Sequence, residues 1–394
     1  MAQHEPAASA TVLSCGVAAI TRAASCAAFV RAESALGSSE TERDVEETLF
    51  LEDHWYIVSL RRDVTDKPRR VIVAGRPLAV YRTPDGAPVA LEDRCPHREV
   101  PLSMGLVQTD GTLQCLYHGI RFARDGACTF IPEETRPIAN ADVRSFPVRE
   151  HGEWVWAFMG DPARASSVSP PAYPWFARPG WKARTGHLHV KCNYKLIVDN
   201  LLNMAHLPYV HPRTIGSEGV VKDAKTSVER RDDGVRLSRR MYDIEPPPTY
   251  KKAGGFEGNV NRWQTIDFIL PSFFEFDTGV IDAGHDIPDT SQPLELPPDV
   301  RVLSRHTMHG VVPETEKSSN YYVGFAYDPA AMSEETADFV FDSVYRTFME
   351  DVEILESQQA NMEMMPDRKR IHIVSDGAGM QAIRIIEEHE RRIR

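Results

Sequence analysis

Residues 95–119, CPHREVPLSMGLVQTDGTLQCLYHG, contain the pattern C-x-H…C-x-x-H. Cys95 and His97 precede residues 98–114, and Cys115 and His118 follow them. Thiolates and imidazoles are common metal ligands. Pro96 and Gly119 suit tight loops around a bound group. The stretch therefore predicts a metal site to which two loops each contribute one cysteine and one histidine.

Two kinds of metal group accept this donor set. In a Rieske [2Fe-2S] cluster, two histidines replace two cysteines on one of the two irons. A Cys₂His₂ zinc site is the alternative. Zinc fingers usually take their cysteines from one element and their histidines from another, whereas each loop here carries one of each. The pattern therefore favours the Rieske cluster, with each loop giving its cysteine to one iron and its histidine to the other.

A second pair of histidines lies in residues 199–211, DNLLNMAHLPYVH. In a regular helix His206 and His211 would point about 140° apart. For them to meet, the helix must be distorted or must end between them, and Pro208 gives a reason. Asp199 and Asn203 would share one helical face with His206. Two imidazoles at a helix break indicate a metal site; two unrelated histidines at a helix end are the alternative.

A carboxylate that completes such a site is sought in the predicted helix over residues 333–361. Apolar residues at 341, 344, 345, 348, 352 and 355 form a stripe at helical spacing. Asp351 borders this stripe, and a carboxylate against a core is costly unless it is paired or binds metal. Glu350 follows Arg346 by one turn, and we expect a solvated ion pair there. Two histidines with one carboxylate are the ligand set of non-haem Fe(II) oxygenases.

Composition excludes several classes of function. The chain has 394 residues, is 42% hydrophobic and 26% charged, and has a net charge of −12. Its pI of about 5.6 argues against binding to nucleic acid or to anionic membranes. The sequence has no apolar run long enough to predict a membrane span. Six cysteines in this length do not form a disulfide scaffold, which favours a reducing, cytoplasmic location.

The order of predicted elements indicates an α+β protein. Residues 1–45 are rich in Ala and Ser and are expected to form a disordered extension. Residues 46–160 contain short strands and turn signals, typical of an all-β domain. Residues 161–182 are rich in proline and predict a linker. Residues 183–394 contain strands followed by helices, which predicts a second domain with an antiparallel sheet flanked by helices.

The motifs at Cys95-Pro96-His97-Arg98, Cys115-Leu116-Tyr117-His118-Gly119 and Asp199-Asn200…His206…His211 resemble the oxygenase component of Rieske non-haem iron oxygenases. The resemblance covers roughly residues 49–394. It is strongest to the branch that includes vanillate O-demethylase, dicamba O-demethylase and phthalate dioxygenase.

The resemblance implies two metal centres and a partner. Cys95, His97, Cys115 and His118 would hold the Rieske cluster, and His206, His211 and Asp351 a mononuclear Fe(II). The chain would be the terminal component of a system in which an NAD(P)H-dependent flavin or ferredoxin-type reductase supplies electrons. Substrate and O₂ would meet at the mononuclear iron.

The resemblance also assigns residues beside the iron. Asn200 matches an asparagine near the metal. Asn203 stands where the family commonly has an acidic residue that bridges to a Rieske histidine of a neighbouring subunit. We expect Asn203 to bridge by hydrogen bonds or Asp199 to assist it. The same bridge implies a homotrimer or a multiple of it.

His309 is a predicted substrate residue, because it aligns with a pocket histidine of the dicamba enzyme. His306 should face the opposite side of the same strand. Phe274 and Phe276 would form an apolar wall for a planar ring. The expected reaction is monooxygenation, most simply O-demethylation, of a methoxylated aromatic acid. Hydroxylation of the ring of an aromatic carboxylate is one alternative, and a Rieske electron carrier without oxygenase activity is another.

Overall fold

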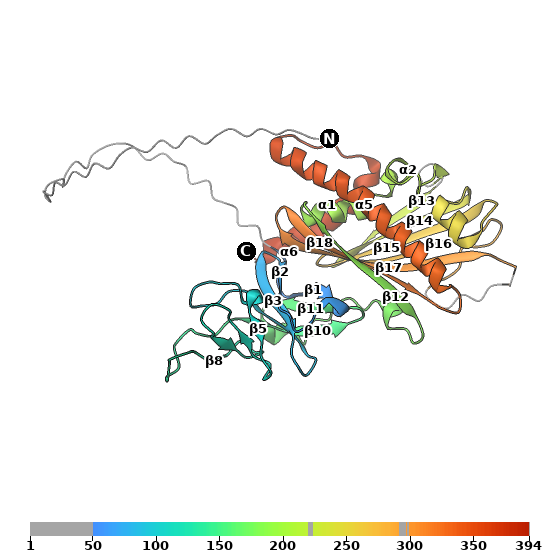
Figure 1. Cartoon of the computed structure of the whole chain (residues 1–394). Coiled ribbons are helices and arrows are strands. Elements are labelled where there is room, and N and C mark those ends of the chain that lie inside the picture. Colours follow the sequence, from blue (N-terminus) through green and yellow to red (C-terminus); the bar gives the residue numbers. More distant parts are fainter. Residues whose placement is uncertain (1–49, 220–223, 291–296, 298, 394) are drawn as a thin grey trace, which may run out of the picture. The chain divides into compact units, whose positions relative to one another are not determined.

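The computed structural model describes residues 50–219, 224–290, 297 and 299–393 (Figure 1). The extension expected over residues 1–45 therefore lies outside the described residues. Residues Thr48–Arg394 form one compact unit. Within the described ranges, no helix is both long and apolar enough to cross a membrane.

The first part of this unit is all-β, as the turn signals predict. One sheet has the strand order β1-β11-β10, a second β2-β3-β4-β9, and a third β5-β6-β7-β8. The strands are β1 (His54–Leu60), β2 (Arg69–Val73), β3 (Arg76–Arg82), β4 (Pro88–Glu92), β5 (Leu106–Val107), β6 (Leu113–Gln114), β7 (Arg121–Phe122), β8 (Cys128–Phe130), β9 (Ser145–Phe146), β10 (Val148–His151) and β11 (Trp154–Met159). Short 3-10 turns lie at Arg61–Asp63, Leu102–Met104, Pro162–Arg164 and Pro174–Ala177. The last two fall in the predicted linker.

The second part is built on an antiparallel sheet of seven strands, in the order β12-β18-β17-β16-β15-β14-β13. This confirms the predicted α+β architecture. The strands are β12 (Lys182–Val190), β13 (Lys225–Arg230), β14 (Gly234–Ile244), β15 (Val260–Ile269), β16 (Phe273–Asp282), β17 (Val302–Thr315) and β18 (Ser318–Tyr327). The helices are α1 (Tyr194–Leu202), α2 (Leu207–Val210), α4 (Pro248–Gly254), α5 (Glu334–Met364) and α6 (Gly377–Ile393), with 3-10 turns at Met204–His206 and Val374–Asp376. Helix α4 begins at Pro248, where a first-turn proline is tolerated.

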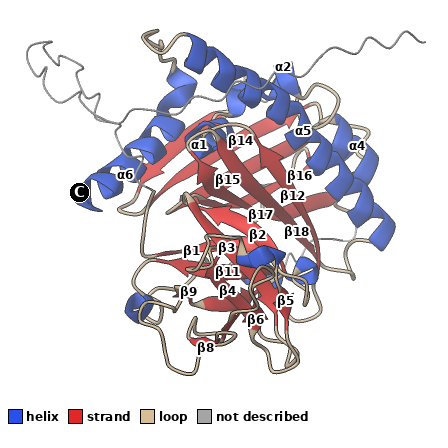
Figure 2. Cartoon of the chain, turned by 60° about the vertical axis from the view of Figure 1, so that its left-hand side comes forward, coloured by secondary structure: helices blue, strands red, loops and turns tan. Residues whose placement is uncertain are grey.

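The two faces of the seven-stranded sheet pack differently, because successive side chains of a strand point to opposite sides. Phe274, Val311 and Val323 belong to the core that the helices cover (Figure 2). Phe273 and Met308 point to the opposite face, and they belong to the core shared with β1 and β11. The sheet therefore separates a helical layer from the N-terminal strands.

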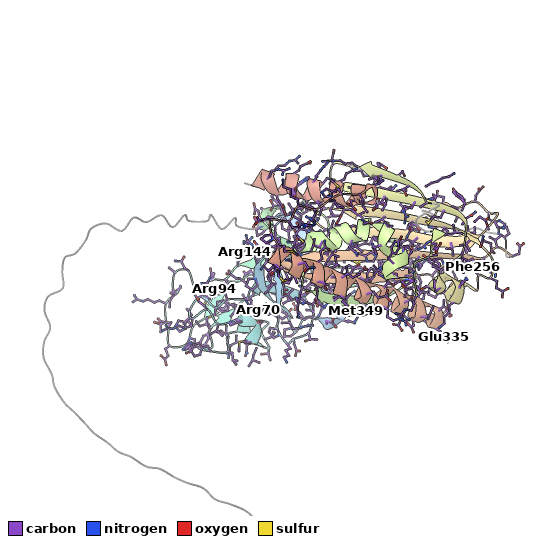
Figure 3. All side chains as sticks on the ribbon, turned by 90° about the horizontal axis from the view of Figure 1, so that it is seen from above. Arg70, Arg94, Arg144, Phe256, Glu335 and Met349 are labelled. Carbon is purple, nitrogen blue, oxygen red and sulfur yellow. The ribbon has the colours of Figure 1, made fainter. Side chains whose placement is uncertain are left out.

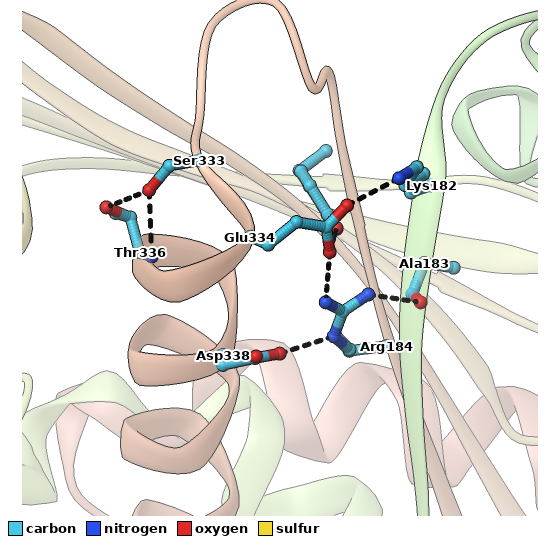
Figure 4. A network of polar contacts seen from close by, with 8 residues as sticks. Lys182, Ala183, Arg184, Ser333, Glu334, Thr336 and Asp338 are labelled. Atoms are coloured by element: carbon cyan, nitrogen blue, oxygen red, sulfur yellow. Dashed lines mark hydrogen bonds and ion pairs between the residues drawn. The ribbon is translucent and has the colours of Figure 1, made fainter.

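Helix α5 crosses the sheet and is fixed at its start by polar contacts. The Ser333 hydroxyl accepts a hydrogen bond from the amide of Thr336 at 3.1 Å, which caps the helix (Figure 4). Arg184 of β12 pairs with Glu334 and, at 2.6 Å, with Asp338. Met349 and Glu335 lie on the exposed side of the helix (Figure 3). The opposite side of α5 is buried and carries Asp351.

Candidate metal centre

The chain that carries the two histidines leaves the helix before reaching them. Helix α1 ends at Leu202, and the Asn203 side chain accepts a hydrogen bond from the Ala205 amide at 3.1 Å. His206 then ends a 3-10 turn, and His211 follows the short helix α2. The predicted break is confirmed, but its cause is Asn203. Pro208 lies in the first turn of α2, where it breaks nothing. The expectation that Asp199, Asn203 and His206 share one helical face is wrong for the same reason.

His206, His211 and Asp351 converge. One ligand atom from each lies within 4.8 Å of the other two. The Asp351 Oδ1 atom is 3.6 Å from Nε2 of His206 and 3.2 Å from Nε2 of His211. Asp351 is 5% exposed, which confirms that it borders the buried stripe of α5. Two imidazoles and one carboxylate directed at one point, with space beside them, fit a facial Fe(II) site.

The hydrogen bonding of His211 supports metal binding. Its Nδ1 lies 2.7 Å from Oε2 of Glu350, and a carboxylate acceptor requires the ring proton to be on Nδ1. In the neutral ring the buried Nε2 then presents a lone pair to a metal ion. This is the carboxylate–histidine–metal arrangement. Burial lowers the pKa of His211, but Asp351 and Glu350 outweigh burial and raise it, so the ring must release a proton when a metal ion binds. The expected pair between Glu350 and Arg346 is wrong, because Arg346 instead donates to the Asp342 carbonyl at 3.3 Å.

Asn200 and His206 complete the surroundings of the site. Asn200 Nδ2 donates to Asp351 Oδ1 at 3.2 Å, which orients the carboxylate. Burial lowers the pKa of His206 and favours the neutral imidazole that a metal ion requires.

Asn203 and Asp199 meet a carboxylate that the sequence patterns do not indicate. Asn203 Nδ2 donates to Oδ1 of Asp376 at 2.9 Å. Burial, and then the negative charge of Asp376, raise the pKa of Asp199. The group of converging ligands described above includes neither Asp199 nor Asn203.

The two loops of the N-terminal domain repeat one backbone pattern. The Cys95 and Cys115 amides donate to the carbonyls of residues 100 and 120, at 3.0 and 2.8 Å. In turn their own carbonyls accept from the amides of residues 99 and 119, at 2.8 and 3.0 Å. Both cysteines are buried, whereas His97 and His118 are exposed with ring centroids 4.5 Å apart. The structure thus places the two histidines side by side at the surface and the two cysteines in one buried cluster.

A cavity opens beside the iron ligands. His309 and Phe276 line it, and their ring centroids are 4.3 Å apart. The expectation that Phe274 forms part of the wall is wrong, because this side chain is fully buried and packs against Phe276 without lining the cavity. His306 lies on the other face of the sheet, as predicted, and stacks on Trp175. The cavity is lined by Asn200, Leu201, Met204, His206, Leu207, His211, Ile215, Arg262, Gln264, Phe276, Thr278, Arg305, Thr307, His309, Val344, Thr347, Phe348 and Asp351.

Models of two known families match the two halves of the chain. The model of the Rieske [2Fe-2S] domain matches residues 54–147, and that of the vanillate O-demethylase oxygenase C-terminal domain matches residues 190–392. The chain belongs to the Rieske non-haem iron oxygenases. Such an oxygenase uses a [2Fe-2S] cluster together with the mononuclear iron of His206, His211 and Asp351. This decides against the zinc site and against a simple electron carrier.

Individual relatives support the same family and branch. A putative toluene-4-sulfonate monooxygenase system iron-sulfur subunit from Comamonas testosteroni is 34% identical over 83% of this Rieske oxygenase and 93% of its own length. The oxygenase component of dicamba O-demethylase from Stenotrophomonas maltophilia is 32% identical over 87% and 98%. The crystal structure of dicamba monooxygenase bound to 3,6-dichlorosalicylic acid matches with a TM-score of 0.78 and 29% identity, over 88% of this chain and 99% of that one. An oxygenase component implies a reductase as partner.

Proposed function

We propose that this Rieske oxygenase catalyses monooxygenation, in the simplest case O-demethylation, of a methoxylated aromatic acid. The observation that carries the proposal is the cavity beside His206, His211 and Asp351, because it combines aromatic walls with a few polar groups. Phe276 and Phe348 would contact the ring of such a substrate. Two relatives are named as O-demethylases of vanillate and dicamba, which are methoxylated aromatic acids, and a third is named for toluene-4-sulfonate, an aromatic acid with a methyl group in place of the methoxy group.

The protein residues would prepare the iron site and the cavity. Glu350 holds the proton of His211 on Nδ1, so that Nε2 faces the metal. Asn200 fixes the orientation of Asp351. The bound iron supplies the activation of O₂, and the cluster supplies electrons one at a time. The apolar side chains Leu201, Val344 and Phe348 exclude water from the cavity.

The ligands of the cluster and the assembly belong to the same proposal. Cys95 and Cys115 would bind one iron, and His97 and His118 the other. The histidines are exposed, so electrons can enter from a reductase or leave to a neighbouring subunit. A homotrimer that places each cluster beside the mononuclear iron of the next subunit fits this exposure. The reductase would be an NAD(P)H-dependent flavin or ferredoxin-type protein.

Turnover with a surrogate reductase tests the proposal. Purified oxygenase with NADH, O₂ and either 4-methoxybenzoate or vanillate should release formaldehyde with one demethylated product per O₂ consumed. An Asp351→Ala protein is the inactive control. If a ring diol formed without formaldehyde, the reaction would be ring hydroxylation and not O-demethylation. Two irons per chain instead of three would contradict the mononuclear site.

A further inference from the structure

Two buried arginines line the cavity on the sheet side. Arg262 of β15 is 1% exposed and Arg305 of β17 is 5% exposed. The strands that carry them flank β16, whose Thr278 is opposite Arg305 in the register. A guanidinium cannot lose its charge in a protein, so burying it is costly unless an anion compensates.

Part of the hydrogen-bonding capacity of both guanidiniums is unused. Arg262 Nη1 donates to the Ile215 carbonyl at 3.1 Å, and Arg305 Nη2 donates to the Tyr250 hydroxyl at 2.5 Å. The buried Nε of Arg262, and both Nε and Nη1 of Arg305, have no acceptor among the described residues. A planar group with adjacent free N–H donors matches a carboxylate or sulfonate.

The acidic residues of the cavity do not neutralise the positive charges of Arg262 and Arg305. Among the described residues that line it, Asp351 is the one carboxylate, and it faces the two iron-binding histidines. Burial lowers the pKa of Arg262 to about 10, so the group stays charged at neutral pH.

Tyr250 lies against both guanidiniums, whose central carbons are 5.3 and 4.6 Å from its ring centroid. Burial raises the pKa of Tyr250, but Arg305 and Arg262 outweigh burial and lower it. The Tyr250 hydroxyl accepts the hydrogen bond from Arg305, and a phenol that keeps its proton there provides no negative charge.

We propose that Arg262 and Arg305 form the binding site for the anionic head group, a carboxylate or sulfonate, of an aromatic substrate. The inference rests on the proposed function and names the residues that select the acid. His309 lines the same cavity in a different role. Its ring nitrogens lie 2.9 Å from the Thr307 hydroxyl and 2.8 Å from that of Tyr321, so both already have protein partners.

Equilibrium binding to the resting holoenzyme tests this site without turnover. The probes are 4-toluenesulfonate, 4-methylbenzoate and the neutral isostere 4-tolyl methyl sulfone, titrated calorimetrically in the absence of O₂. We expect the wild-type protein to bind at least one anion about 10- to 100-fold more tightly than the sulfone. The two anions distinguish a sulfonate from a carboxylate site. Equal affinities for the anions and the sulfone would overturn the proposal.

Variants assign the effect to the arginines. Arg305→Met and Arg262→Met should each lose about 10- to 100-fold in affinity for the anion, and little for the sulfone. Arg305→Lys, which keeps the charge without the planar fork, should recover part of the loss. Arg236→Met is the matched control, because Arg236 lies on the other face of the sheet and pairs with Asp267. Unchanged anion affinity in folded Arg305→Met would contradict the site.

Four further outcomes keep the test decisive. If the methionine variants do not fold, Arg305→Lys and the wild-type comparison of sulfonate with sulfone still decide. If Tyr250 carries the negative charge, the resting protein will show tyrosinate absorption at neutral pH that Tyr250→Phe removes, and the head-group site is then refuted. Anion binding without formaldehyde release from any methoxyarene would refute the proposed function and leave the site standing. Equal turnover of neutral and acidic methoxyarenes would refute the head-group site and leave O-demethylation as the function.

Discussion

Removal of the Glu350 carboxylate should weaken iron binding without disturbing the Rieske cluster. Glu350 Oε2 lies 2.7 Å from Nδ1 of His211, whose ring is fully buried. A hydrogen bond to a charged acceptor contributes about 1.5–3 kcal/mol. Glu350 is itself 34% exposed, so water replaces part of the interaction and the lower value applies. Since about 1.4 kcal/mol corresponds to a factor of ten, Glu350→Ala should lower Fe(II) affinity about tenfold.

The assay is competition for Fe(II) between the mononuclear site and a chromogenic chelator, under anaerobic conditions. Rieske absorbance in the same sample reports that the cluster is intact. Glu350→Gln keeps a neutral acceptor and should fall between Glu350→Ala and wild type. Glu353→Ala, on the exposed side of the same helix, is the control. If Glu350→Ala holds iron as tightly as Glu353→Ala does, Glu350 does not orient His211.

Three further outcomes are expected. Asp351→Ala should retain the Rieske spectrum and lose mononuclear iron and product formation, and surviving turnover would exclude Asp351 as a ligand. Burial, and then Arg178, lower the pKa of His306 to about 3. The unfolded chain therefore binds a proton at this residue more readily than the folded protein does. The fold loses stability as the pH falls from about 6.5 towards 3, by at most about 1.4 kcal/mol per pH unit. His306→Gln should therefore flatten the acid side of the denaturant-midpoint profile, and a parallel profile would contradict this. Asn203→Asp should destabilise the fold by about 1–3 kcal/mol, because a second carboxylate would face Asp376. Adding Asp376→Asn to this variant should restore its stability to urea. If the two substitutions destabilise the fold additively, the contact does not contribute.

The sequence predicts best those features that depend on local pattern. The strand β1 at His54–Leu60 is one of them, because its aromatic and β-branched residues favour a strand. The ligand set of His206, His211 and Asp351 could be predicted for another reason. A buried carboxylate is costly unless it is paired or binds metal, and two histidines with one carboxylate are a known set of iron ligands, so residue type and burial together favoured these three residues.

The sequence could not predict which distant partner each polar residue meets. Glu350 has Arg346 one turn away on α5, and the local rule for ion pairs selected Arg346. The tertiary fold brings His211 instead, because the residue that follows α2 lies beside Glu350. Arg262 and Arg305 lie on strands β15 and β17, and they are buried because helices cover this face of the sheet. Burial of one face of a sheet is a property of what covers it, and a single strand does not encode that.

The amide at position 203 follows from the same kind of long-range contact. Asn203 accepts a hydrogen bond from the Ala205 amide through Oδ1 and donates one to Asp376 through Nδ2. An aspartate could accept the first bond, but in its ionised form it has no proton for the second. With Asp376 in place, an acidic residue at 203 would add a third carboxylate to a group in which Asp199 already has a raised pKa. The contact with Asp376, which lies in the 3-10 turn before α6, therefore favours an amide over a carboxylate at position 203.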